Sequence, residues 1–320
     1  MTKTLLCSGL IVLMILSCGY VAYSQCRLLQ EGTFAPQNKK IKLVTRPGET
    51  GSSNKVIFFK TSLRVNTDGA PNSYHPQDLT GTQRAINNIC NGVGVYRIGR
   101  NGRRIKLPCQ EARRIFAQFR DSNWSVPSGY RINWQNVIAP KTENGRVVPC
   151  VFQTGEFGGY FGSLTSLRNG LTGAHAGECG YKNQLDQRFI SAFVLPGGQN
   201  VVKAFGADVG DLLVAYNPRN NIVTLAIIGD TGPVDKLGEG SVGLNMALLG
   251  RTEQPMTYRD ALRLDTGNNE MLIAIIPNSR NFTPQKPFTR ENIAERIQNW
   301  ISQAQFGSQQ NFVDFMKACD

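Results

Sequence analysis

A series of short apolar runs between residues 190 and 276 constrains the fold of this chain most strongly. The runs are rich in β-branched or aliphatic residues, and turns containing Pro, Gly, Asn and Asp separate them. They occupy residues 190–195, 201–205, 211–216, 222–228 and 271–276. Runs of this kind, at this spacing and with no long helix between them, are typical of strands in a small barrel or sandwich. We therefore predict a mainly β fold.

Composition divides the chain into four parts: 1–24, 25–54, 55–280 and 281–320. The first part combines Lys3, an apolar stretch and a small-residue pattern ending at Ser24, which is typical of a cleaved signal peptide. An uncleaved N-terminal anchor is the alternative. The second part is polar, and we expect it to be a lead-in segment that contributes few residues to the hydrophobic core. No later segment has 18 unbroken apolar residues, so we expect a secreted (in a Gram-negative cell, periplasmic) protein with no membrane span in the mature chain.

The local pattern predicts several elements around the main strands. VIFFK at 56–60 predicts a strand, 80–92 a short helix, and 95–107 a hairpin around an Asn-Gly turn. A second helix is predicted over 109–120, whereas 123–180 has no clear pattern. Thr289 can cap a C-terminal helix with an apolar stripe at helical spacing. The stripe is Ile293, Ile297, Trp300 and Ile301, and a second apolar face is Phe312, Phe315 and Met316.

The cysteines favour disulfide bonds. Removal of residues 1–24 leaves Cys26, Cys90, Cys109, Cys150, Cys179 and Cys319. An even number in an exported chain favours pairing, with about 15 arrangements if all are joined. No Cys-x-x-Cys pair occurs and the chain has only two histidines, so a zinc site is not favoured. We expect neither a metal nor a cofactor.

Positive charge is concentrated in one insert near 97–180. The formal net charge is +12, and it becomes +11 when Lys3 is lost with the signal. Eight basic residues oppose the single acid Glu111 in the block 97–120, a local +7: Arg97, Arg100, Arg103, Arg104, Lys106, Arg113, Arg114 and Arg120. Such a block can dock on an anionic polymer or envelope. Nucleic acid is not favoured, because aromatics are sparse and no nucleic-acid motif is present. A solvated basic face is the alternative.

Two carboxylates follow the apolar strand at 222–228. Asp230 lies in a tight Gly-Asp-Thr-Gly-Pro turn, and Glu239 follows between two glycines, where a bulky substrate can approach the backbone. Two carboxylates flanking a bond suit glycoside hydrolysis, in which one donates a proton and the other activates water or attacks carbon. A solvated acidic turn is the alternative, and Asp235 is expected at the surface.

The segment AIIGDTGPVDKLGEGSVGL resembles the core motif of the fungal-type chitosanases, glycoside hydrolase family 75. Three further blocks are similar to segments of that family: 58–76, 189–198 and 272–280. The resemblance implies an endo-acting hydrolase that cleaves β-1,4-linked amino-sugar polymers with inversion, and it places the essential carboxylates on Asp230 and Glu239. Glu239 is our expected acid, because apolar surroundings raise a carboxyl pKa.

The resemblance also implies a fold and a set of substrate-binding residues. The Asp-Thr-Gly turn, together with Gly-Asp at 210–211, resembles the double-psi barrels of three-aspartate, cell-wall-lytic proteins, which implies a six-stranded barrel core with peripheral helices and leaves peptidoglycan open as a substrate. The expected substrate-binding residues are Asp68, Tyr74, His75 and Thr231. Asp68 can instead form an Asp-Gly turn, and a histidine before proline is often only a turn residue.

The basic charge opposes a polycationic substrate such as chitosan over a Debye length. An anionic or acetylated glycan, or docking on an anionic envelope, suits this charge better. A second hypothesis therefore stands beside the hydrolase. In it, the chain is a catalytically inert secreted module that binds an anionic polymer or cell envelope through the region Arg97–Arg120.

Overall fold

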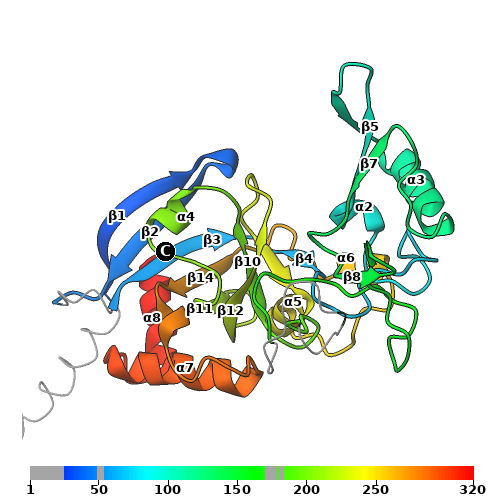
Figure 1. The fold of residues 1–320 in the computed structure, drawn as a ribbon. Helices are drawn as coiled ribbons and strands as arrows, with labels where there is room; N and C mark the ends of the chain where they lie inside the picture. Colours follow the sequence, from blue (N-terminus) through cyan, green and yellow to red (C-terminus); the bar gives the residue numbers. More distant parts are fainter. Residues whose placement is uncertain (1–24, 49–53, 170–178, 180–183) are drawn as a thin grey trace, which may run out of the picture.

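The computed structural model describes residues 25–48, 54–169, 179 and 184–320. The predicted signal peptide at 1–24 lies outside the described residues. A mixed sheet dominates the described chain (Figure 1), with strands in the order β1-β2-β3-β14-β11-β12-β10-β13-β4. In chain order its strands are β1 (Arg27–Phe34), β2 (Lys39–Thr45), β3 (Val56–Thr61), β4 (Arg64–Asn66), β10 (Ala192–Pro196), β11 (Leu212–Asn217), β12 (Ile222–Gly232), β13 (Glu239–Ser241) and β14 (Met271–Ile276).

The mainly β fold is confirmed, but the predicted six-stranded barrel is not. Among the described residues the large sheet has nine strands, and it runs from β1 at one edge to β4 at the other without closing. Most neighbours are antiparallel, whereas β10 pairs with β12 and β13 with β4 in parallel. The observed architecture is therefore an open mixed sheet.

Both faces of the central strand β14 are buried, which explains why this strand is apolar at every position. In β14, Leu272, Ala274 and Ile276 contribute to one core cluster, and the alternating Met271, Ile273 and Ile275 contribute to another. Because successive side chains point to opposite faces, a strand covered on both sides loses the polar alternation of a half-exposed strand.

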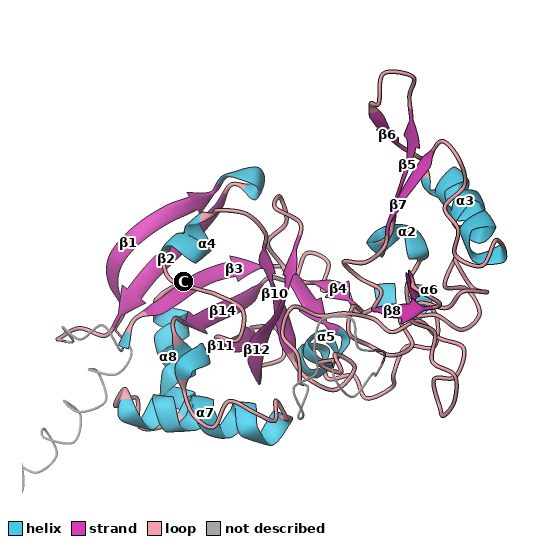
Figure 2. Cartoon of the chain, viewed as in Figure 1, coloured by secondary structure: helices cyan, strands magenta, loops and turns pink. Residues whose placement is uncertain are grey.

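The predicted C-terminal helices cover one of these faces. They are α7 (Arg290–Gln303) and α8 (Gln309–Ala318), and Figure 2 places both beside β11 and β14. Thr289 caps α7 as predicted, since its side chain accepts a hydrogen bond from the backbone N–H of Asn292. The predicted stripe of Ile293, Ile297, Trp300 and Ile301 is buried.

Two sequence predictions about the main sheet are wrong. Residues 201–205 contribute the helix α4 (Val201–Ala204), because the Asn200 side chain accepts hydrogen bonds from the backbone N–H groups of Val202 and Lys203 and so caps a helix. Residues 25–54 do contribute to the core. They supply β1 and β2, and Phe34, Ile41 and Leu43 are buried in the sheet.

A separate lobe follows β4 and carries the basic insert (Figure 1). The predicted hairpin and helix are confirmed as β5–β6 and α3, whereas the helix expected over 80–92 is reduced to the single turn α2. The lobe elements are α2 (Ile89–Gly92), β5 (Gly94–Ile98), β6 (Arg104–Lys106), α3 (Cys109–Asp121), β7 (Tyr130–Asn133), β8 (Pro140–Glu143) and β9 (Arg146–Pro149). The remaining elements are η1 (Ala35–Gln37), α5 (Val242–Leu249), α6 (Tyr258–Leu262) and η4 (Ser279–Asn281).

All six predicted disulfide cysteines are paired, as Cys26–Cys319, Cys90–Cys109 and Cys150–Cys179. Cys26–Cys319 joins the start of β1 to the end of α8 and thereby holds the C-terminal helices on the sheet. Cys90–Cys109 joins α2 to α3 within the lobe. Among the described residues, none of the helices has the length and apolarity needed to cross a bilayer.

The Cys26–Cys319 bond should contribute most to stability, because the two cysteines are 293 residues apart and the bond restricts the unfolded chain most. We expect the double variant Cys26→Ser/Cys319→Ser to lose about 2–5 kcal/mol of the free energy of unfolding, measured by urea titration. The matched control is Cys90→Ser/Cys109→Ser, whose cysteines are only 19 residues apart and whose loss should be smaller. The reverse ranking would contradict this explanation.

Candidate active site

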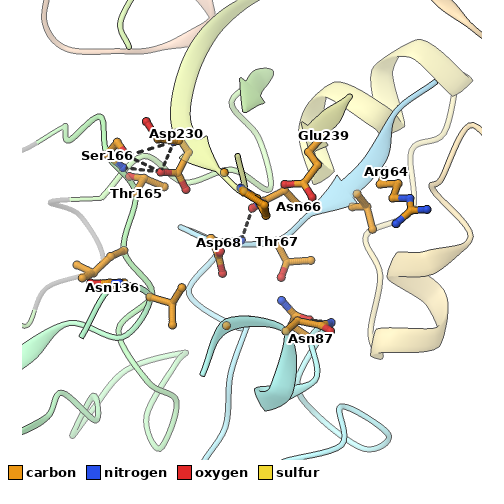
Figure 3. A pocket seen from close by; sticks show the side chains of 18 of the residues that line it. Arg64, Asn66, Thr67, Asp68, Asn87, Asn136, Thr165, Ser166, Asp230 and Glu239 are labelled. Carbon is orange, nitrogen blue, oxygen red and sulfur yellow. Dashed lines mark hydrogen bonds between the residues drawn. The ribbon is translucent and has the colours of Figure 1, made fainter. Parts of the chain in front are cut away.

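A polar cavity of about 930 Å³ lies between the β4 edge of the sheet and the base of the lobe. The sheet side contributes Asp230, Thr231 and Glu239, and the lobe side contributes Asn91 and Asn136. Figure 3 shows the carboxylates of Asp68, Asp230 and Glu239 around this space. Asp230 and Glu239, which the sequence singled out, therefore line one cavity.

Asp230 is buried near the end of β12, and three donors hold one of its oxygens. The backbone N–H of Ser166, the Ser166 hydroxyl and the backbone N–H of Thr231 all donate to Oδ1, at 3.0, 2.6 and 2.8 Å. Burial raises the pKa of Asp230, and these hydrogen bonds oppose that rise because they favour the charged form. In the described part of the chain, no donor contacts Oδ2.

Glu239 is the first residue of β13, and the glycine before it allows the backbone to turn into this strand. Gly238 has φ +112°, and a Cβ at Gly238 would lie 2.3 Å from the carbonyl oxygen of Ser62. Only glycine fits there without a shift of the backbone. Burial raises the pKa of Glu239, whereas Lys236, a hydrogen bond from Asn66, and Arg64 act in the opposite direction.

A single residue of β10 sets the relation between the two acids. Val194 pairs with Asp230 of β12 on one side and with Glu239 of β13 on the other. Residues paired across neighbouring strands project from the same face, so both carboxylates lie on one face of the sheet. Strand spacings of ~4.8 Å place the two backbones about 10 Å apart.

The side chain of Glu239 narrows this separation. A Cβ on Gly232, two residues beyond Asp230 in β12, would lie 3.2 Å from Oε2 of Glu239, so the Glu239 carboxyl reaches across β10. Two residues along a strand span roughly 7 Å. These backbone spacings, roughly 7 and 10 Å, overlap the separation of about 6.5–9.5 Å that leaves room for a water molecule between inverting carboxylates.

Asp68 is a third carboxylate in the cavity, held by a chain of polar side chains. Tyr74 donates its hydroxyl to Oδ1 of Asp68 at 2.7 Å, Asn87 donates its amide to the Tyr74 hydroxyl at 2.9 Å, and Asn91 donates to Asn87 at 2.7 Å. Burial raises the pKa of Asp68 to about 7, with a further contribution from the charge of Asp230. Asp68 therefore changes charge near neutral pH.

The other predicted site residues divide into two groups. Tyr74 and Thr231 line the cavity, as does Asp68. His75 does not line it. It is buried, its Nδ1 accepts the backbone N–H of Gln77, and its ring packs edge-on against Tyr160 at 4.8 Å. Asp235 is exposed, as expected.

Sequence reasoning missed the residues that hold the acids. Ser166 contacts Asp230 from a segment without a recognisable pattern, and Asn66 contacts Glu239 from the neighbouring strand β4. Both are long-range contacts, so no local signal in the sequence could have identified them. Three basic residues also line the cavity: Arg64, Arg168 and Lys236. Within the described ranges, no group of three or more His, Cys, Asp or Glu side chains has an arrangement suited to a metal ion.

Comparisons with known proteins add no relative. Neither a scan against protein-family models nor a search of curated proteins finds a match for this chain. The chemistry of the site is therefore argued from its residues.

The raised pKa of Asp68 makes stability depend on pH. The unfolded chain loses the Asp68 proton near pH 3.8 and the folded chain near pH 7, so this residue destabilises the fold increasingly from pH 4 to pH 7 and fully above pH 7. We expect Asp68→Asn to stabilise the protein at pH 8 by on the order of 2–4 kcal/mol and to have little effect at pH 4.

Urea unfolding at pH 4, 6 and 8 measures this difference. Asp235→Asn, in the exposed loop between β12 and β13, is the control for the loss of one negative charge near the site. An Asp68→Asn effect that is the same at all three pH values would contradict the assigned pKa.

Proposed function

We propose that this chain is an exported, endo-acting glycoside hydrolase that cleaves a β-1,4-linked amino-sugar polymer of the chitosan type. The observation that carries the proposal is the shared pairing of Asp230 and Glu239 with Val194. This pairing puts two desolvated carboxylates on one face of a polar cavity, at a separation suited to two-carboxylate hydrolysis.

The environments of the two acids suggest their roles. The three donors on Oδ1 favour the ionised form of Asp230, which makes Asp230 the general base. Burial raises the pKa of both acids, and we assign the general acid to Glu239, whose carboxyl accepts a hydrogen bond from Asn66 in place of the three donors that hold Asp230. Glu239 gives its proton to the glycosidic oxygen as the bond to the anomeric carbon breaks. Asp230 takes a proton from the water that attacks this carbon from the opposite side.

In this proposal, the other predicted site residues that line the cavity contribute to substrate binding. Asp68 binds or orients a sugar amine, and its ionised form is the one that attracts an ammonium group. Tyr74 fixes Asp68 through its hydroxyl, and Thr231 borders the cavity beside the general base. His75 takes no part, because it packs outside the cavity.

The resemblance to the fungal-type chitosanases supports this function through the motif that contains both acids. The double-psi barrel implied by the resemblance has no support from the open sheet, so the family assignment depends on the motifs alone. The three disulfides are compatible with export, and we propose the secretory signal at 1–24 on the sequence pattern.

The inert binding module is the second candidate. The observation that favours it is the exposure of basic side chains on the lobe, including Arg103, Arg104 and Arg114. It predicts salt-sensitive binding to an anionic polymer without release of reducing ends, and loss of that binding when Arg103, Arg104, Arg113 and Arg114 are replaced.

The hydrolase proposal predicts large losses for conservative changes of the two acids. Asp230→Asn and Glu239→Gln should each reduce the release of reducing ends at least about a hundredfold, because each removes one proton-transfer group while preserving size. The assay uses chitosan, chitin oligomers and peptidoglycan as substrates.

Asp235→Asn is the matched control, because it removes an exposed carboxylate from the loop that joins the two acids. It should retain nearly full activity. Full activity of both Asp230→Asn and Glu239→Gln would exclude the assignment, and a wild-type protein inactive on every polymer of the panel would favour the binding module.

A further inference from the structure

The small sheet of the lobe has two faces with different chemistry. Its strand order is β6-β5-β7, and its register pairs Tyr96 with Lys106 on one side and with Arg131 on the other. Paired residues share a face, so Lys106, Tyr96 and Arg131 form a row across the three strands. Arg104, paired with Ile98, lies on the same face one step further out. We call this the basic-aromatic face.

Contacts of individual side chains agree with this assignment. The Arg131 Nε donates to the Asn133 side chain at 3.0 Å, two residues along the same strand. A Cβ on Gly94 would lie 2.9 Å from the Tyr96 ring, so the ring lies against the glycine two residues before it. Gly94 therefore gives the aromatic ring room to lie close to the sheet.

The opposite face of this sheet is covered. Val95 and Ile132 pack there against Ile115 and Phe116 of α3. In Figure 1, α3 lies on the side of β5 and β7 away from the large sheet, so the basic-aromatic face is on the side of the large sheet in this view. It is the open face of the lobe.

Among the residues that the structure describes, the cations of this face have no acidic partner. Arg104, Lys106 and Arg131 are exposed, and none of the ion pairs among the described residues includes them. By contrast, Arg120 of the same lobe pairs with Asp121 at 2.7 Å. A row of unpaired cations around an aromatic ring can therefore interact fully with an external anion.

The segments next to β5 and β7 line the cavity. Asn91 and Gly92, which precede β5, and Gln135 and Asn136, which follow β7, all line the cavity. Tyr96 lies two residues beyond Gly94, the first residue of β5, about 7 Å along the strand. A chain held in the cavity that follows β5 outward thus reaches the row of Tyr96, Lys106 and Arg131.

We propose that the basic-aromatic face is a distal binding site for an acidic polysaccharide whose chain continues into the cavity. Tyr96 packs against the flat face of a sugar ring, and Lys106 and Arg131 bind carboxylate or sulfate groups on either side of it. This inference rests on the proposed glycoside hydrolase activity, and among amino-sugar polymers it favours one that carries carboxylate or sulfate groups beyond the cleavage point over chitosan, which is a polycation. It also explains how a chain with a charge of +12 acts on a polysaccharide.

The observations favour an acidic glycan over the other large anions. The row contains one aromatic ring, whereas single-stranded nucleic acid binding uses several rings to stack successive bases. A flat membrane cannot follow the face into the cavity.

The experiment compares two charge-matched double variants for binding to hyaluronan and heparin, with dextran as the uncharged reference. Lys106→Ala/Arg131→Ala removes two cations from the basic-aromatic face. Arg113→Ala/Arg114→Ala removes two cations from α3, on the outer side of the lobe. Binding is measured at low and at physiological salt, and thermal unfolding verifies that both variants fold.

We expect Lys106→Ala/Arg131→Ala to weaken binding to at least one acidic polysaccharide tenfold or more at low salt, and Arg113→Ala/Arg114→Ala to weaken it less than twofold. Equal losses in the two variants, or no wild-type binding to either acidic polysaccharide, would overturn the proposal. Tighter wild-type binding to poly(dT) or to phosphatidylglycerol vesicles than to both polysaccharides would also overturn it.

The same measurement in the Asp230→Asn background separates this inference from the proposed activity. Lys106→Ala/Arg131→Ala should weaken polysaccharide binding in the Asp230→Asn background by the same factor as in the wild-type protein. Binding that persists while the catalytic assay fails on every substrate would refute the hydrolase and retain the binding site. Cleavage without any effect of Lys106→Ala/Arg131→Ala on binding would refute only the distal site.

Discussion

The arrangement of the candidate site depends on the pairing of β10 with two different strands. β12 runs parallel to β10 and β13 runs antiparallel to it, so Val194 has Asp230 on one side and Glu239 on the other. The chain between the two acids therefore crosses from one side of β10 to the other. Gly238, at φ +112° and in close contact with Ser62, allows the turn into β13. Without this crossover, Asp230 and Glu239 would both lie on the β12 side of β10.

Burial determines the chemistry of the carboxylates in this cavity. It raises the pKa of Asp68, Asp230 and Glu239, and specific donors then differentiate the three groups. Asp230 has donors on a single oxygen, which keeps it fixed and favours its charge. Asp68 accepts a hydrogen bond from Tyr74, yet burial, with a further contribution from the charge of Asp230, raises its pKa to about 7.

The sequence predicted the elements whose pattern is local and missed those defined by distant contacts. The apolar strands, α3, α7 and the basic hairpin follow from periodicity and turn residues. Residues 201–205 form a helix because Asn200 caps it, and β1 was overlooked because most of its residues are exposed and polar. The strand-end pattern led to Asp230 and Glu239. Ser166 and Asn87 come from distant segments, and the ring of His75 packs against Tyr160. No sequence pattern indicates these contacts.

The lobe and the sheet together define what the cavity can accept, but the separation of the two acids determines the reaction. The stereochemistry of the product tests this separation most directly. Proton NMR during cleavage of a β-linked amino-sugar oligomer identifies the anomer released first. We predict the α-anomer, because the backbone spacings around Val194, roughly 7 and 10 Å, leave room for an attacking water molecule between the two carboxyl groups. First release of the β-anomer would indicate a covalent intermediate and carboxyl groups about 5 Å apart, which would contradict the arrangement around Val194.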